Sequence, residues 1–232
     1  MQNFKITSVL LLLLSSFAFA QEPDIERVTA VSYAGDIAGL ETMRAEIKDV
    51  SYPGAYLKYR LAIAYYVSGK SDLSDDLLAE TVSDLEKIVA ANPESADAYA
   101  LLATSIGMRI SFRPAVRGIT MGAASDRAMK RAQEIDPANP RVWLVKGIAA
   151  HNTPTMFGGG TKKALTALDE AISIYATDAS GWGQADAYIC RGLTHQGNGD
   201  TVLARADFQA ALAASPDYEW AEQLLNALDA QS

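Results

Sequence analysis

Apolar residues recur at intervals of three and four positions along almost the whole chain, whereas strand-like alternation is scarce. This spacing is typical of helices that bury one face. Proline follows three of the apolar stretches, at Asn92-Pro93, Asp136-Pro137 and Ser215-Pro216. Because the residue before proline is pushed out of the α region, each of these residue–proline pairs predicts the end of one helix and allows the next to begin. The pattern predicts helices over residues 36–48, 55–68, 72–90, 95–110, 120–135, 139–150, 162–175, 184–196, 200–214 and 217–229, with one or two N-terminal helices within 24–49.

An internal repeat is clearest near the C-terminus. Tyr188 is followed by Gly192 four positions later, and a turn at 197–200 leads into a second spaced set. That set is Ala204, Phe208, Ala211 and Pro216. The spacing resembles the tetratricopeptide (TPR) repeat, in which an aromatic residue, a small residue four positions on and the pattern A-x-x-x-F-x-x-A-x-x-x-x-P recur. The preceding interval repeats the pattern without the proline, and two earlier intervals, beginning at Tyr59 and Tyr99, match it more weakly.

The resemblance to TPR proteins implies an all-α fold of stacked antiparallel helix hairpins, a TPR-like α-solenoid of about four units. Residues 21–54 would form an N-terminal helical segment, 55–216 the repeat domain and 217–232 a C-terminal capping helix. One hairpin cannot bury its apolar face alone, so the units are expected to stack. Gly147 and Gly192 should let the two helices of a hairpin approach closely. A helical bundle without repeats is the alternative.

The first twenty residues have the features of a secretory signal peptide. Lys5 supplies a positive charge, residues 9–14 are an unbroken apolar run, and residues 18–20 read Ala-Phe-Ala, a cleavage signal. An uncleaved anchor is the alternative, but the apolar stretch is broken by Ser15 and Ser16 and is shorter than the roughly 20 residues that a span needs. We therefore expect a periplasmic protein with no membrane insertion after cleavage, secretion being the alternative.

Charge and composition argue against several classes of function. The formal net charge is −8, and phosphate backbones are bound by clustered Lys and Arg, so no nucleic-acid partner is expected. One cysteine and two histidines permit no internal disulfide and leave little material for a metal site. Neither G-x-S-x-G nor H-E-x-x-H occurs. We expect no cofactor, no metal, no catalytic residue and no enzymatic activity.

Two insertions interrupt the repeat pattern. The first, residues 109–118, is expected to be a basic loop that either meets a carboxylate or phosphate or pairs with neighbouring Asp and Glu. The second contains P-x-x-F-G-G-G-x-x-K-A at 154–164 and resembles a loop of exported bacterial TPR proteins, some of which accompany periplasmic solute-uptake systems. Three interpretations stay open for it: a structural loop with Phe157 in the core, an anion site at a helix N-terminus beside Lys162 and Lys163, or a partner-binding loop. Its candidate binding residues are Phe157, Gly158, Gly159 and Gly160.

A curved repeat stack leaves a concave groove lined by the first helix of each hairpin. Helical spacing directs eight candidate binding residues toward this groove, and we call them the inner stripe. They are Arg141, Leu144, Ile148, His151, Asp186, Ile189, Leu193 and Gln196. Trp182 is a further candidate, either as a ligand-stacking residue or as a packing anchor.

The mixed polar and apolar character of the inner stripe suits an extended peptide or a partner helix. The leading prediction is therefore a non-catalytic exported scaffold that binds a protein or peptide of the cell envelope in its concave groove. The alternative is an accessory small-ligand-binding protein of a periplasmic solute-uptake system. The identity of the partner and the oligomeric state stay open.

Overall fold

The computed structural model describes residues 24–177 and 182–230, so the predicted leader lies outside the described residues. Every regular element in the described part is helical. The elements are α1 (Ile25–Tyr33), α2 (Ile37–Ala45), α3 (Tyr52–Val67), α4 (Ser71–Ala91), α5 (Ala96–Phe112), α6 (Pro114–Ile135), α7 (Pro140–Asn152), the 3-10 turn η1 (Thr155–Phe157), α8 (Thr161–Tyr175), α9 (Gln184–Gly197), α10 (Thr201–Ala214) and α11 (Glu219–Asp229).

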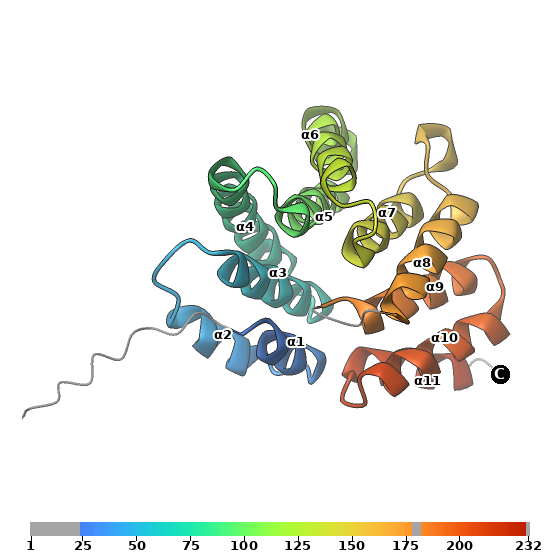
Figure 1. The fold of residues 1–232 in the computed structure, drawn as a ribbon. Helices are drawn as coiled ribbons and strands as arrows, with labels where there is room; N and C mark the ends of the chain where they lie inside the picture. Colours follow the sequence, from blue (N-terminus) through green and yellow to red (C-terminus); the bar gives the residue numbers. More distant parts are fainter. Residues whose placement is uncertain (1–23, 178–181, 231–232) are drawn as a thin grey trace, which may run out of the picture.

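Four helix hairpins follow one another along the chain: α3/α4, α5/α6, α7/α8 and α9/α10. The first helices α3, α5, α7 and α9 also contact one another in order, so they line the inner side of a curved stack (Figure 1). Helices α1 and α2 pack on α3, and α11 packs on α10. This is the stacked-hairpin α-solenoid that the repeat spacing predicts.

The close helix approach predicted at two glycines is confirmed. A Cβ atom on Gly147 would lie 2.5 Å from the Leu168 Cγ atom, and one on Gly192 would lie 2.4 Å from the Phe208 ring. Leu168 and Phe208 are themselves fully buried. The small and large residues of the repeat therefore interlock as expected within the α7/α8 and α9/α10 hairpins.

The first insertion is not a loop, and that prediction is wrong. Helix α5 continues to Phe112 and α6 begins at Pro114, so the extra residues lengthen both helices. Proline is favourable at the first position of a helix because its missing N–H would have no partner there. Arg109 and Arg117 both bind Asp75 on α4, at 3.2 Å and 2.6 Å. The predicted pairing with neighbouring acids is thus confirmed.

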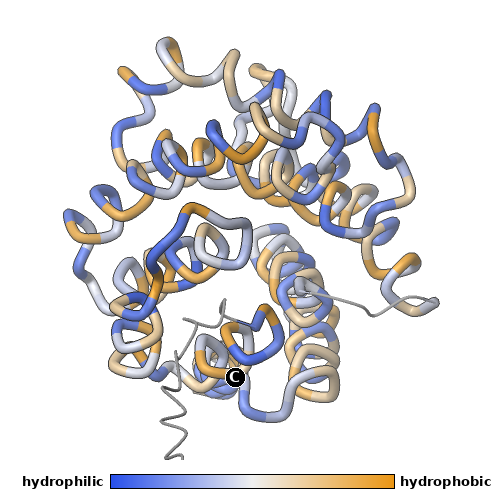
Figure 2. The backbone as a smooth tube through the Cα atoms, turned by 60° about the vertical axis from the view of Figure 1, so that its left-hand side comes forward, coloured by the Kyte–Doolittle hydropathy of each residue, from blue (hydrophilic) through white to orange (hydrophobic). Residues whose placement is uncertain are grey.

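Apolar and polar turns alternate along the helices (Figure 2), consistent with a core spread along the stack. One cluster of buried side chains runs from α1 to α9, and a second joins α9, α10 and α11 to Tyr33 of α1. No helix in the described part of the chain is long and apolar enough to cross a membrane.

Candidate functional site

Most of the inner stripe is packed inside the protein. Leu144 and Ile189 have no exposed surface, and Ile148 and Leu193 are partly buried against the same two clusters. Gln196 is also half-buried. The structure therefore brings these residues to the interior side of the stack, but in contact with the protein's own side chains.

The charged members of the inner stripe already have partners. The Arg141 guanidinium donates to Asp97 of α5 through Nε at 2.7 Å and Nη2 at 3.0 Å. Asp186 accepts from three side chains, described below. His151, at the end of α7, is the exposed member of the stripe.

Trp182 is a packing anchor in the structure. Its side chain is 4% exposed, its Nε1–H donates to the Tyr52 hydroxyl at 2.7 Å, and its ring stacks on Tyr56 at 5.2 Å. Its backbone oxygen accepts from the Tyr175 hydroxyl at 2.6 Å. These contacts attach the segment before α9 to the inner face of α3.

A buried cluster around Asp186 joins the two ends of the stack. Arg60 of α3 contacts Asp186 of α9 at 3.0 Å, and the hydroxyls of Tyr33 and Tyr218 donate to the same carboxylate at 2.9 Å and 2.7 Å. The rings of Tyr33 and Tyr218 stack with centroids 3.9 Å apart. Arg60 also lies over the Tyr33 ring and donates from Nε to Ser32 at 2.8 Å. We call these five side chains the junction cluster.

Burial raises the pKa of Tyr33 and of Tyr218 well above the ordinary value, and the charge of Asp186 acts in the same direction. Both phenols therefore keep their protons, and each donates a hydrogen bond to the Asp186 carboxylate. With Arg60 as the third donor, both oxygens of the carboxylate accept hydrogen bonds. The junction cluster is a satisfied structural network.

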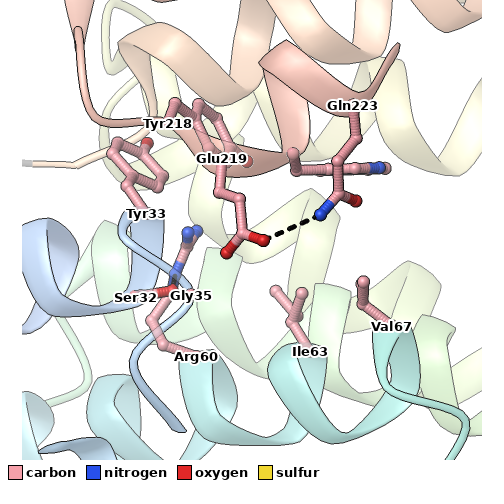
Figure 3. Close-up of a pocket in the computed structure, with 10 residues that line it drawn as sticks. Ser32, Tyr33, Gly35, Arg60, Ile63, Val67, Tyr218, Glu219 and Gln223 are labelled. Atoms are coloured by element: carbon pink, nitrogen blue, oxygen red, sulfur yellow. Dashed lines mark hydrogen bonds between the residues drawn. The ribbon is translucent and has the colours of Figure 1, made fainter. Parts of the chain in front are cut away.

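A small cavity of about 70 Å³ lies beside the junction cluster, between α3 and α11 (Figure 3). Ile63 and Val67 form its apolar wall, and Glu219 and Gln223 of α11 face them. Pockets for drug-sized ligands are usually about 300–1,000 Å³. This cavity is therefore too small to enclose such a molecule.

The loop between α7 and α8 is the most exposed apolar segment of the described chain. Met156 is 83% exposed and Phe157 is 73% exposed. Phe157 is therefore not in the core, and that interpretation of the loop is wrong. The loop projects beyond the ends of both helices (Figure 1).

The glycines shape this loop and fix where it returns. Gly158 and Gly160 have φ angles of 92° and 108°, which disfavour any other residue. Gly159 is packed so tightly that a Cβ atom would clash with the Thr153 carbonyl oxygen. The Gly160 N–H donates to the Ala150 carbonyl at 2.8 Å, and Lys163 Nζ donates to the Gly158 carbonyl at 2.8 Å. Both groups point inward to the loop itself, which weakens the anion-site interpretation.

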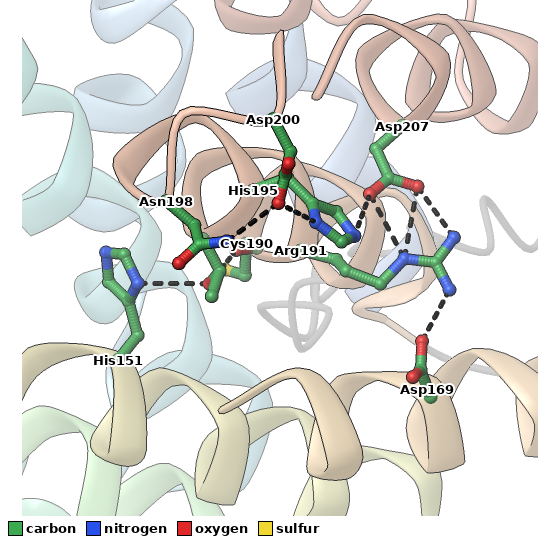
Figure 4. A network of polar contacts seen from close by, with 9 residues as sticks. His151, Asp169, Cys190, Arg191, His195, Asn198, Asp200 and Asp207 are labelled. Atoms are coloured by element: carbon green, nitrogen blue, oxygen red, sulfur yellow. Dashed lines mark hydrogen bonds and ion pairs between the residues drawn. The ribbon is translucent and has the colours of Figure 1, made fainter. Parts of the chain in front are cut away.

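His151 lies where this loop begins, and its tautomer follows from its partner. Its Nδ1 atom is 3.0 Å from the Thr194 hydroxyl oxygen, and that hydroxyl donates to the Cys190 carbonyl at 2.7 Å. A threonine hydroxyl has one proton. Since this proton is used on Cys190, Thr194 accepts from His151 Nδ1–H. The neutral ring therefore carries its lone pair on Nε2, which points away from the contact network (Figure 4).

The other histidine is held in an ionic network on α9 and α10. Arg191 contacts Asp207 at 2.6 Å and Asp169 at 2.7 Å, and His195 Nε2 lies 3.9 Å from the Asp207 carboxylate. The His195 side chain is only 15% exposed, and its Nδ1 has no hydrogen-bond partner within the described part of the chain. Among the described residues no three His, Cys, Asp or Glu side chains group in a way that could hold a metal ion.

Apart from Val50, between α2 and α3, the exposed large apolar residues of the described chain lie near the turns within the hairpins, a feature that the sequence does not predict. They lie within a few residues of each turn, so every hairpin contributes some of them to one edge of the stack, which we call the turn edge. They are Tyr66, Val67 and Leu73 at α3/α4, Val116 and Ile119 at α5/α6, Met156 and Phe157 at α7/α8, and Val202 and Leu203 at α9/α10. Apolar residues outside the repeat pattern and beside a turn are the signal that could have revealed them.

Solved structures of the same architecture are found. The haemophore HusA from Porphyromonas gingivalis aligns with a TM-score of 0.56 and 25% identity, covering 75% of this chain and 94% of HusA. TTC0263, a TPR protein from Thermus thermophilus, aligns with a TM-score of 0.54 and 16% identity, covering 88% of this chain and 98% of that protein. The chain has a TPR-like fold. No family model and no curated protein matches the sequence.

Proposed function

We propose that this TPR-like protein is an exported, non-catalytic carrier of a small amphipathic ligand of the porphyrin class, acting with a solute-uptake system of the cell envelope. The observation that carries the proposal is the likeness to HusA, a haemophore, over nearly the whole of that protein. The leader-like residues 1–20 support export.

The geometry supports a ligand site on the surface over one in the concave groove. The inner stripe is filled by the protein's own side chains, and the cavity at the junction cluster is small. The exposed apolar surface lies at the turn edge. A flat apolar ring with charged substituents would therefore lie against exposed apolar side chains of this edge.

Titration of the purified protein with ferric haem and with metal-free protoporphyrin tests this proposal. Haem absorbance and tryptophan fluorescence should both change to saturation at a fixed stoichiometry, and the midpoint of thermal unfolding should rise with ligand concentration. A matched titration with a non-porphyrin aromatic dye should give no saturable change. Absence of saturable binding of either porphyrin would refute the carrier function.

A second candidate is the scaffold that the repeat pattern favours, with a protein partner of the cell envelope. The specific observation behind it is the turn edge, because exposed apolar side chains contributed by every hairpin form a repeated surface. Contiguous exposed apolar surface is a common mark of protein interaction sites. The contact would then lie on the edge of the stack and leave the inner stripe buried.

Crosslinking and mass spectrometry of captured periplasmic proteins tests the scaffold. The matched bait should carry Val116→Asp and Ile119→Asp, because both side chains are exposed, at 63% and 86%. A substitution in the inner stripe, such as Leu144→Asp, is unsuitable as a bait, since a charge at that buried position would disturb folding. A partner captured by the wild-type bait and lost with the edge variant supports the scaffold, and equal capture by both baits argues against this edge.

A further inference from the structure

His151 has the arrangement of a metal-binding imidazole without a metal. A histidine ligand usually donates its second ring N–H to a neighbouring oxygen, which fixes the tautomer and the ring orientation. Here Thr194 accepts from Nδ1–H and is itself fixed by its own bond to Cys190. Nε2 is left with its lone pair on an exposed residue.

Burial on the protein side of the ring lowers the pKa of His151. The neutral form, which has the lone pair, is therefore favoured near neutral pH. No carboxylate is found in contact with His151 in the described residues, so no ion pair opposes this effect.

The segment that follows His151 in the sequence carries exposed apolar and cationic side chains. Met156 and Phe157 are exposed five and six residues further along. The loop that carries them closes at the end of α7, because the Gly160 N–H donates to the carbonyl of Ala150, the residue before His151. Lys162 is exposed at the start of α8. In a protein of net charge −8, this combination suits a flat apolar ligand that carries carboxylates.

We propose that His151 Nε2 coordinates the iron of a porphyrin that lies against Met156 and Phe157, with Lys162 meeting a carboxylate of the ring. The proposal rests on the carrier function and names the site and the ligand atom. The bond is a donor bond from the Nε2 lone pair to the iron, and it requires no change of oxidation state. Thr194 is a positioning residue, since it acts through His151.

The other histidine and the cysteine of the described chain are less suited to this role than His151. His195 is enclosed by the Arg191–Asp207 network. Burial raises the pKa of the Cys190 thiol well above its ordinary value, so the thiolate that would bind iron is not formed. Because the chain has two histidines, the second provides a matched control.

The first test compares the purified wild-type protein with His151→Ala and, as control, His195→Gln. Each is titrated with ferric haem and, separately, with metal-free protoporphyrin. We expect His151→Ala to weaken ferric haem binding by at least about tenfold. Loss of a residue that only hydrogen-bonds to a metal ligand already costs about 10–100-fold in affinity, and loss of the ligand itself should cost at least as much. The absorbance and electron paramagnetic resonance spectra of His151→Ala should lose the imidazole signature. Binding of the metal-free ring should change by less than about twofold, and His195→Gln should match the wild type.

The outcomes separate the two proposals. If the wild type and His151→Ala bind ferric haem with the same affinity and the same spectrum, the coordination is wrong and the carrier function stands. If neither porphyrin binds the wild type, the carrier function is wrong, and the coordination by His151 that rests on it is wrong as well. If His195→Gln, and not His151→Ala, loses the imidazole signature, iron is bound at the other histidine and this site is wrong.

A second variant keeps the histidine and removes only its orientation. Thr194→Val is close to isosteric but cannot accept from His151 Nδ1–H. We expect an about 10–100-fold loss of ferric haem affinity, a shifted spectrum, and recovery of both with Thr194→Ser. Far-ultraviolet circular dichroism and urea unfolding check that the variant is folded. A wild-type spectrum and affinity in folded Thr194→Val would overturn the role of Thr194 and the tautomer on which the site depends.

Discussion

The junction cluster and the α7–α8 loop both contain aromatic and polar side chains, yet they differ in how many of these side chains are exposed and lack a hydrogen-bond partner. At the junction cluster, Asp186 accepts from Arg60, Tyr33 and Tyr218, and all of these side chains are buried or nearly so. At the loop, Met156 and Phe157 face solvent, and His151 keeps one ring nitrogen free of any hydrogen bond among the described contacts.

The difference separates stability from binding. Buried polar groups without partners are costly, so a cluster in which every group is engaged contributes to one defined structure. Apolar surface that stays exposed does not contribute to the free energy of folding, and it is available to a ligand. Substitutions in the junction cluster should therefore change the free energy of unfolding, whereas substitutions in the loop should change ligand binding.

The largest expected effect is at Arg60. Arg60→Leu leaves the Asp186 carboxylate buried without its charged partner, and breaking a buried ion pair in this way costs about 3–5 kcal/mol of unfolding free energy. Urea unfolding followed by circular dichroism measures the loss. The control is Arg205→Leu, which removes an exposed pair with Asp229 and should cost less than about 1 kcal/mol. Equal losses in the two variants would contradict the structural role of the junction.

A smaller effect is expected where two helices meet through a glycine. Gly192→Ala places a methyl group against the Phe208 ring, at 2.4 Å before relaxation, and overpacking of this kind costs about 1–3 kcal/mol. The double variant Gly192→Ala/Phe208→Leu should recover part of the loss by making room. If Phe208→Leu adds its full cost to that of Gly192→Ala, the two side chains do not compete for space.

The pH dependence of stability provides a third comparison. Because burial lowers the pKa of His151 in the folded protein, the unfolded chain binds a proton at this residue at a higher pH than the folded one. The unfolding free energy should therefore fall as the pH drops below the unfolded value of about 6.5, by no more than about 1.4 kcal/mol per pH unit for one proton. Unfolding measured at several pH values from neutral to mildly acidic gives the slope. His151→Gln should lose less stability over this range, and an unchanged slope would remove His151 as the source.

The smallest effect on stability is expected at the loop. Met156→Ser and Phe157→Ser change exposed side chains, so the unfolding free energy should stay within about 0.5 kcal/mol of the wild type. Affinity for metal-free protoporphyrin should fall in both, because the variants remove apolar surface from the proposed site. A loss of stability comparable to that of Gly192→Ala would show that the loop packs more than its exposure indicates.

The sequence predicted what depends on neighbouring residues and missed what depends on distant ones. Gly147 and Leu168 belong to one hairpin, and their spacing is sufficient to predict that the two helices meet. Arg60 and Asp186 are 126 positions apart, and no local pattern relates them, so the sequence does not predict the junction cluster. Helical spacing describes each helix separately, so it directs the inner stripe to a groove without showing what packs against it.

The candidate site was foreseen only in part. The glycine pattern identified the α7–α8 loop, and helical spacing selected His151, but neither could indicate that Phe157 is exposed. Thr194 carried no motif, and its importance follows from a contact across 43 positions. The basic residues around Pro114 favour a loop in the sequence, whereas proline is favourable in the first turn of a helix, and α6 begins there.

Open repeat stacks of this kind behave nearly as one-dimensional arrays, in which each unit contacts only its neighbours and the terminal units can fray first. The stacking of Tyr33 on Tyr218 attaches α1, the first helix of the described residues, to the residue that directly precedes α11. Neither terminal helix can then detach without loss of a contact at the opposite end of the sequence. Unfolding should therefore be a single cooperative event, with hydrogen exchange at α1 and α11 about as slow as in the helices between them.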